Sequence, residues 1–286
     1  MMKTSKRVLL SLAPAVLALG FTTACGRSAT EASAVKVTNG VAIAENTFPS
    51  TVLLVSMSAE GEAICTGTFI NDSQVLTAGH CVEGLSKTKP SIYYATDKGG
   101  QMAAIAQAVS YVRNPKYSFA EGVSAHDISI INFPANTAPA VTALAESTPE
   151  VGEEFTIVGY GNNENYLSKG VLDGAGAGVK RAGKNFISST DDGMITFAGL
   201  TGVETAPVQG EKAGELVSSG AGDSGGPLLV KGKLAGITSG GGLSKTEDGL
   251  DVAISLYVDV NSAESRAFLA TVVKKSAAVS SVKLGE

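Results

Sequence analysis

Short apolar runs rich in β-branched residues recur along most of the chain, separated by Gly, Pro and Asn. Residues 51–55 (TVLLV), 128–131 (ISII) and 155–158 (FTIV) are examples. Runs of this length between turn-forming residues are typical of β-strands. Within this body, apolar residues first recur at helical spacing in 263–275, which ends in lysines. The pattern therefore predicts an all-β sandwich or barrel from about residue 37, followed by one helix.

The composition fits such a turn-rich body. Glycine accounts for 34 of the 286 residues, against a usual share of about 7%. With 44% hydrophobic and 17% charged residues, the chain can bury a core and does not belong to the disordered class. Its net charge is -5 and the body has no run of lysine or arginine, so we expect no nucleic-acid partner.

The N-terminus has the pattern of a secretory signal peptide. Basic residues precede an almost wholly apolar stretch, 8–21, and small residues follow up to Cys25. The stretch is shorter than the ~20 residues of a membrane-spanning helix, and it contains a proline. We expect residues 1–24 to be a signal peptide and the protein to be exported: secreted, periplasmic or lipid-anchored at the cell envelope.

Cys25 is a candidate for lipid attachment. The preceding residues 22–24 (TTA) resemble a bacterial lipobox, although that motif prefers Leu at its first position. The chain has three cysteines, and a lipid on Cys25 would leave Cys65 and Cys81 as a pair. The lipid would attach the protein to a membrane through a tether or pro-segment, 25–36. The alternative is a simple signal peptide, with Cys25 removed or left as a free thiol.

Two segments combine a reactive side chain with unusual neighbours: 76–81 (LTAGHC) and 222–227 (GDSGGP). Ser224 lies among glycines on a tight turn, where it is sterically open and backbone N–H groups can converge on one point. A serine nucleophile needs a base, and the base needs a carboxylate to orient it. His80 lies in the first segment, and Asp127 precedes an apolar strand. We interpret these residues as nucleophile, base and orienting carboxylate.

The strings TAGHC, DISII and GDSGGP, in the order His, Asp, Ser, resemble the chymotrypsin/trypsin family of serine endopeptidases. The similarity extends over nearly all of 37–268, and the leader makes the chain look like an exported bacterial member. The resemblance implies a chymotrypsin-like fold of two packed six-stranded antiparallel β-barrels with a C-terminal helix. It makes 37–275 the peptidase domain. Residues 276–286 are small and polar, and we expect them to form a flexible tail.

The resemblance also implies a mechanism. Ser224 would attack the scissile carbonyl while His80 takes its proton, and Asp127 would stabilise the imidazolium that forms. The backbone N–H groups of Gly222 and Ser224 would hold the developing oxyanion. Ser239 matches a serine that the family hydrogen-bonds to the buried aspartate, so we expect it to orient Asp127.

Two structural features follow from the same resemblance. Cys65 and Cys81 match the family's disulfide beside the catalytic histidine. Lys36 followed by Val37 resembles the family's activation site, where cleavage frees an α-amino group that pairs with the aspartate before the nucleophile, here Asp223. The alternative is that Lys36 is an ordinary tether lysine and that the enzyme works without processing.

The specificity pocket is expected to be uncharged. By residue count from the nucleophile, Ser218 matches the base of the pocket, which is aspartate in trypsin-like members. Further substrate-binding residues would be Ser239, Gly240, Gly241 and Ser255, the first three of them on the edge that pairs with substrate backbone. An apolar or aromatic P1 side chain is the direct inference. The alternatives are a shallow, weakly selective pocket and an acidic floor supplied by Glu247, Asp248 or Asp251.

These observations predict a serine endopeptidase that acts on protein or peptide substrates as a monomer. We expect no cofactor and no metal, because two histidines without an HExxH motif and the lack of a CxxC pair leave no recognisable zinc site. The alternative from another class is a catalytically idle relative that serves as a binding module or adhesin.

Overall fold

The computed structural model describes residues 37–58, 61–97, 102–168, 171–201, 212–246, 249 and 251–274. The expected signal peptide, the tether with Cys25, and the tail lie outside the described residues, so these assignments remain predictions. In the part of the chain that the structure describes, no helix has both the length and the apolar character needed to span a membrane.

The described chain consists of β-strands, two one-turn 3₁₀ helices (η) and one α-helix. In chain order the elements are β1 (Val41–Ala42), β2 (Thr51–Ser58), β3 (Gly61–Phe69), β4 (Gln74–Thr77), η1 (His80–Val82), β5 (Ile92–Asp97), β6 (Met102–Gln107), β7 (Ser110–Arg113), η2 (Phe119–Glu121), β8 (Ser129–Asn132), β9 (Glu154–Gly159), β10 (Glu164–Ser168), β11 (Val171–Ala175), β12 (Arg181–Phe186), β13 (Ser189–Asp191), β14 (Met194–Gly199), β15 (Pro227–Val230), β16 (Lys233–Lys245), β17 (Asp251–Asp259) and α1 (Ala263–Val272).

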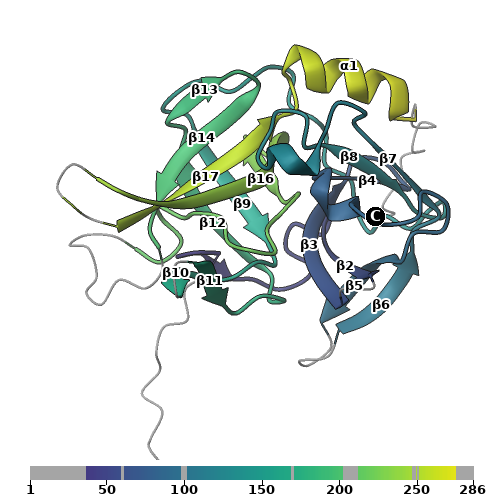
Figure 1. The fold of residues 1–286 in the computed structure, drawn as a ribbon, viewed down its shortest axis with the longest axis horizontal. Helices are drawn as coiled ribbons and strands as arrows, with labels where there is room; N and C mark the ends of the chain where they lie inside the picture. Colours follow the sequence, from purple (N-terminus) through teal and green to yellow (C-terminus); the bar gives the residue numbers. More distant parts are fainter. Residues whose placement is uncertain are drawn as a thin grey trace, which may run out of the picture. The chain divides into compact units, whose positions relative to one another are not determined.

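Two curled antiparallel sheets contain most of the strands (Figure 1). The first has the order β6-β5-β2-β3-β4-β8-β7 and the second the order β1-β12-β9-β15-β16-β17-β14-β13, while β10 and β11 form a separate hairpin. The predicted all-β, chymotrypsin-like fold is confirmed. The sheets have seven and eight strands instead of six each. Residues 108–109 separate β6 from β7 in the first sheet, and the short β1 and β13 are added to the second.

Strands β4 and β8 are buried on both faces, which explains the two consecutive apolar residues at the centre of each. Successive side chains of a strand point to opposite faces. Val75 and Ile131 lie in a cluster formed within the first sheet. Their neighbours Leu76 and Ile130 lie in another cluster, which also contains residues of β9, β15, β16, β17 and α1. The second cluster therefore packs the two sheets and the helix against one another.

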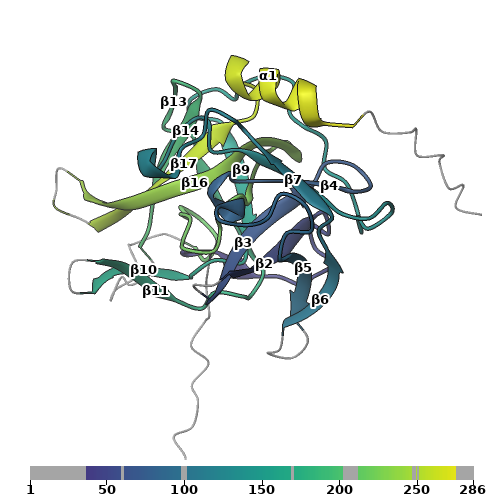
Figure 2. The ribbon, with the colours of Figure 1, turned by 45° about the vertical axis from the view of Figure 1, so that its right-hand side comes forward.

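Helix α1 begins where predicted, with Ser262 as the N-cap whose hydroxyl accepts a hydrogen bond from the Ser265 N–H. It lies beside both sheets in two views (Figures 1 and 2), and it buries Phe268 against the shared cluster. We predicted that it would continue to residue 275, but it ends at Val272. There the buried Gln74 side chain of β4 donates to the Val272 carbonyl, at 3.0 Å.

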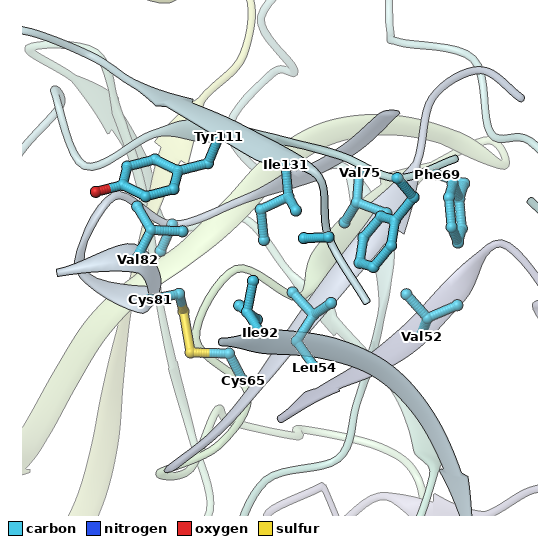
Figure 3. Close-up of a cluster of buried hydrophobic side chains, with 13 residues drawn as sticks. Val52, Leu54, Cys65, Phe69, Val75, Cys81, Val82, Ile92, Tyr111 and Ile131 are labelled. Atoms are coloured by element: carbon cyan, nitrogen blue, oxygen red, sulfur yellow. A yellow bond between two sulfur atoms is a disulfide. The ribbon is translucent and has the colours of Figure 1, made fainter. Parts of the chain in front are cut away.

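The predicted disulfide between Cys65 and Cys81 is confirmed, with a Cα–Cα distance of 6.2 Å. It joins β3 to η1 at the border of the first sheet's apolar cluster, where Leu54, Ile92 and Val82 surround it (Figure 3). This cross-link fixes the segment that contains His80 to the neighbouring strand.

Candidate active site

The pairing of β4 with β8 places His80 beside Asp127. The two strands are antiparallel, with Thr77 opposite Ser129. His80 lies three residues after the end of β4, and Asp127 lies two residues before the start of β8. The end of one antiparallel strand and the start of its partner share one edge of a sheet. Residues 47 positions apart in sequence therefore meet at this edge.

Asp127 is 1% exposed and accepts three hydrogen bonds. Its Oδ1 accepts from the His80 backbone N–H at 2.8 Å. Its Oδ2 accepts from His80 Nδ1 at 2.8 Å and from the Ser239 hydroxyl at 2.7 Å. An ionised carboxylate only accepts, so we assign the proton to Nδ1. In the neutral ring this leaves Nε2 as a free acceptor, as a general base requires.

Ser224 lies on a turn that is pressed against the end of β4. Gly225 has a φ of 76°, and a Cβ there would clash with Thr77 Oγ1, so only glycine permits this approach. The turn continues directly into β15 of the second sheet. The nucleophile candidate therefore lies at the junction of the two sheets, next to the segment that leads to His80.

His80 and Ser224 come together around the disulfide. Cys81 Sγ lies 3.6 Å from the Ser224 carbonyl oxygen, and a ring nitrogen of His80 lies within 4.8 Å of the sulfurs of Cys81 and Cys65. Both sulfurs are used in the disulfide, so this group does not form a metal site. Among the described residues, no hydrogen bond joins His80 to the Ser224 hydroxyl. Bonds of this kind are often long without substrate.

Beside the nucleophile candidate, the backbone N–H groups of Gly222 and Ser224 have no acceptor within the described part of the chain. The carbonyl of Ala221, which belongs to the same peptide plane as the Gly222 N–H, accepts from the Asn162 N–H at 2.8 Å. This bond directs the Gly222 N–H away from Asn162. Such unused donors are what an oxyanion requires.

Asp223 is 2% exposed and accepts from the N–H groups of Gly161 and Gly220, both at 2.8 Å. Burial raises the pKa of this carboxyl to about 6, although the two amides and the Arg181 charge oppose the change. Val37 is 1% exposed and lies in the apolar cluster of the second sheet. Among the described residues no ion pair joins Val37 to Asp223. In the intact chain the Val37 nitrogen belongs to the peptide bond with Lys36 and carries no charge.

A neutral pocket of about 220 Å³ opens next to Ser224. Its walls come from the segment before the nucleophile and from β16 and β17. Among the described residues no charged side chain contributes to the lining, which consists of Ser219, Gly220, Ala221, Ser224, Thr238, Gly240, Gly241, Gly242, Leu243, Ala253 and Ile254.

Two residues predicted for the pocket are buried and do not line it. Ser218 is 0% exposed, and its hydroxyl donates to the Leu200 carbonyl at 2.8 Å. Ser255 is also 0% exposed; its Oγ accepts from the Ser219 N–H at 2.9 Å and lies 3.1 Å from the Ser219 hydroxyl. Of the neighbours Ser218 and Ser219, it is thus Ser219 that lines the pocket.

Asp251, one of the three acidic residues considered for the pocket floor, does not line the pocket. This residue pairs with Lys245 at 2.5 Å, and both side chains are exposed. The pair lies at the far end of the β16–β17 ladder, whereas Gly241 pairs with Ser255 nearer the pocket. Glu247 and Asp248 lie outside the described residues.

The edge segment begins at a bulge in β16. The register between β16 and β17 shifts between Thr238 and Gly240. On the other side of β16, the ladder with β15 ends at Ile237. Beyond this point, within the described residues, Gly240 and Gly241 pair with β17 alone. One edge of the strand is therefore open beside the pocket, as strand addition by an extended peptide requires.

Sequence reasoning missed Thr66, which contacts the nucleophile turn, and the pocket residues Ser219, Thr238 and Leu243. Thr66 follows Cys65 directly, but threonine is common in strands and gives no signal of its own. Ser219 follows the expected pocket base by one residue, so its place could be found only once the direction of each side chain was known.

Comparison with known proteins agrees with this geometry. The family model described as Trypsin matches residues 37–265. Serine protease 1 of Canis lupus familiaris is 27% identical over 230 residues, covering 78% of this chain and 87% of its own length. Trypsin of Saccharopolyspora erythraea is 26% identical, with 74% and 90% covered, and anionic trypsin of Bos taurus is 28% identical, with 78% and 87% covered. The chain belongs to the trypsin family.

Proposed function

We propose that the protein is a serine endopeptidase that cleaves protein or peptide substrates through His80, Asp127 and Ser224. The observation that carries the proposal is the buried Asp127 carboxylate, which holds His80 by its ring and its backbone beside the Ser224 turn. The membership of the trypsin family and the name of serine protease 1 support the same class of activity.

In the proposed reaction, Ser224 Oγ attacks the scissile carbonyl carbon and His80 Nε2 accepts the hydroxyl proton. Asp127 stabilises the imidazolium, and the N–H groups of Gly222 and Ser224 donate to the oxyanion. The C–N bond then breaks as His80 protonates the leaving amine. Water hydrolyses the acyl group on Ser224, again with His80 as the base. Ser239 keeps Asp127 in place through its hydroxyl.

We further propose that the chain is a precursor activated by cleavage after Lys36. The new ammonium group of Val37 would neutralise Asp223, whose charge is unfavourable in its buried position in the intact chain. A neutral pocket does not favour a lysine at P1, so a different protease has to make this cut. We also propose that a signal peptide exports this precursor and that a lipid is attached at Cys25.

The pocket supports a neutral P1 side chain. Its lining combines Leu243, Ile254 and Ala253 with glycines and hydroxyls, and within the described structure it contains no carboxylate that would bind lysine or arginine. An apolar or aromatic P1 residue remains our proposal. We propose that the floor of the pocket lies at the Ser219 hydroxyl and the buried Ser255 hydroxyl behind it, which are 3.1 Å apart.

A fluorophosphonate probe tests the catalytic proposal. Processed protein that begins at Val37 should be labelled, and Ser224→Ala should abolish labelling. His80→Ala should slow labelling strongly, whereas His126→Ala, the matched change at the other histidine, should leave the rate within about twofold. Each variant is compared with the parent for folding by circular dichroism.

The alternative is a catalytically idle binding module. The observation in its favour is that His80 and Ser224 share no hydrogen bond in the described structure. Folded, processed protein that the probe does not label, and that cleaves no member of a peptide library, would support this alternative and contradict the peptidase.

A further inference from the structure

The peptide between Gly222 and Asp223 is held by a residue of the other sheet. Gly222 has a φ of 101°, a conformation that favours glycine, and the Asp223 N–H of its following peptide donates to the Gly220 carbonyl at 3.0 Å. The Gly222 carbonyl accepts from the Thr66 hydroxyl at 2.9 Å. Thr66 lies on β3, 156 residues away in sequence. The contact therefore joins the two sheets at the expected oxyanion site.

The orientation of the Thr66 hydroxyl is fixed by a second partner. Its oxygen accepts from the Tyr160 N–H at 3.1 Å while its proton goes to Gly222. Thr66 is 0% exposed, so water cannot replace either bond without a rearrangement. A hydroxyl with both functions used in a dry site has one rotamer and one proton direction.

The rest of Thr66 contacts the turn on the other side of the nucleophile. Its N–H donates to the Ser224 carbonyl at 2.8 Å, and its carbonyl accepts from the Thr77 hydroxyl at 2.9 Å. A Cβ placed on Gly226 would lie 3.2 Å from the Thr66 methyl. Thr66 thus lies against Gly222, Ser224 and Gly226, which are the residues before, at and after the nucleophile candidate.

We propose that Thr66 is a positioning residue for the oxyanion site, and this rests on the proposed peptidase function. By holding the Gly222 carbonyl, its hydroxyl keeps the peptide that lies between the two N–H donors in one orientation. Both donors then point to the same place before substrate arrives. Thr66 touches no reacting atom, so its effect should appear in the chemical step and not in substrate binding.

The test compares Thr66→Val with Thr66→Ser in processed protein. Val keeps the shape and removes the hydroxyl, which leaves the Tyr160 N–H and the Gly222 carbonyl without a partner. We expect kcat on a peptide ester or amide to fall about 10- to 100-fold, less than the loss of a whole oxyanion donor, with KM within about threefold. The affinity for a peptide aldehyde should fall in parallel with kcat. Ser keeps the hydroxyl and should restore kcat to within about threefold of the parent.

Thr68→Val is the matched control. Thr68 lies on the same strand and is also 0% exposed, but its hydroxyl has no partner within the described structure. This variant should retain the parental kcat. If Thr66→Val does not fold, Thr66→Ala against Thr66→Ser makes the same comparison.

The outcomes distinguish a failure of the Thr66 proposal from a failure of the peptidase proposal. A parent protein without activity or probe labelling would contradict the peptidase itself. An active parent whose Thr66→Val variant keeps the parental kcat would overturn the role of Thr66. Equal losses of kcat in Thr66→Val and Thr66→Ser, or in Thr66→Val and Thr68→Val, would overturn it as well, because the hydroxyl would then not be the cause.

Discussion

The buried carboxyl of Asp223 should make the intact chain less stable as the pH rises. Burial raises its pKa from the ordinary value of 3.8 to about 6, despite hydrogen bonds from Gly161 and Gly220 and the charge of Arg181. A carboxyl with a raised folded pKa holds its proton more tightly in the folded state. Its contribution to the free energy of unfolding is therefore full below about pH 4 and declines between about pH 4 and pH 6.

The size of this decline follows from the two pKa values. They differ by about two pKa units, which corresponds to about 3 kcal/mol. This is a large part of the free energy of unfolding of a typical domain, which is about 5–15 kcal/mol. Cleavage after Lys36 should remove the decline, because the Val37 ammonium would then stabilise the charged carboxylate.

Urea denaturation of the uncleaved chain measures the effect. The parent should carry Ser224→Ala to prevent proteolysis, and it is compared with the same protein carrying Asp223→Asn, which cannot ionise. Unfolding free energies at pH 4, 5, 6 and 7 give a slope for each. Burial also raises the pKa of Asp259, but this group titrates in both proteins and cancels in the difference. Equal slopes, or a parent that gains stability relative to the Asn variant as the pH rises, would refute the reasoning.

Three further predictions concern the site and its support. Replacing Cys65 and Cys81 together by Ser should lower the free energy of unfolding by about 3 kcal/mol, since the disulfide closes a loop of 16 residues; urea denaturation would show an unchanged midpoint if this is wrong. Ser239→Ala removes one of three hydrogen bonds to the buried Asp127, and steady-state kinetics should show kcat lower by about tenfold at unchanged KM. Ser255→Gly removes the partner of a pocket hydroxyl and adds room, so kcat/KM for an aromatic P1 relative to alanine should rise about tenfold in a peptide series, and an unchanged ratio would count against the proposed floor.

Local sequence was sufficient where the determining interactions are local or periodic. The apolar runs at 51–55 and 155–158 became β2 and β9, and the helical spacing became α1. The fold followed from the resemblance carried by three short strings, as did the pairing of Cys65 with Cys81. The strand count and the end of α1 differed, because chain bends and a side chain from β4 decide where an element stops.

The proximity of His80 to Asp127 had a sequence basis only through the motif. The structure adds its cause, which is the antiparallel register of β4 and β8. The expectation of an uncharged pocket rested on Ser218, which the structure shows to be buried and outside the pocket lining. Which of Ser218 and Ser219 lines the pocket could not be predicted, because these neighbours have different surroundings in an irregular segment.

By itself, then, the sequence determined the kinds of element, the family and the candidates for the reactive side chains, since strand periodicity and short motifs depend on neighbouring residues. Tertiary structure alone decided that Thr66 holds the Gly222 carbonyl and that Ser255 accepts a hydrogen bond from the Ser219 N–H. It also placed Arg181 where its charge lowers the pKa of Asp223. Each of these contacts joins distant segments. Such contacts depend on how the sheets pack and on which face each side chain takes, and an ordinary threonine or serine in a strand carries no local mark of either.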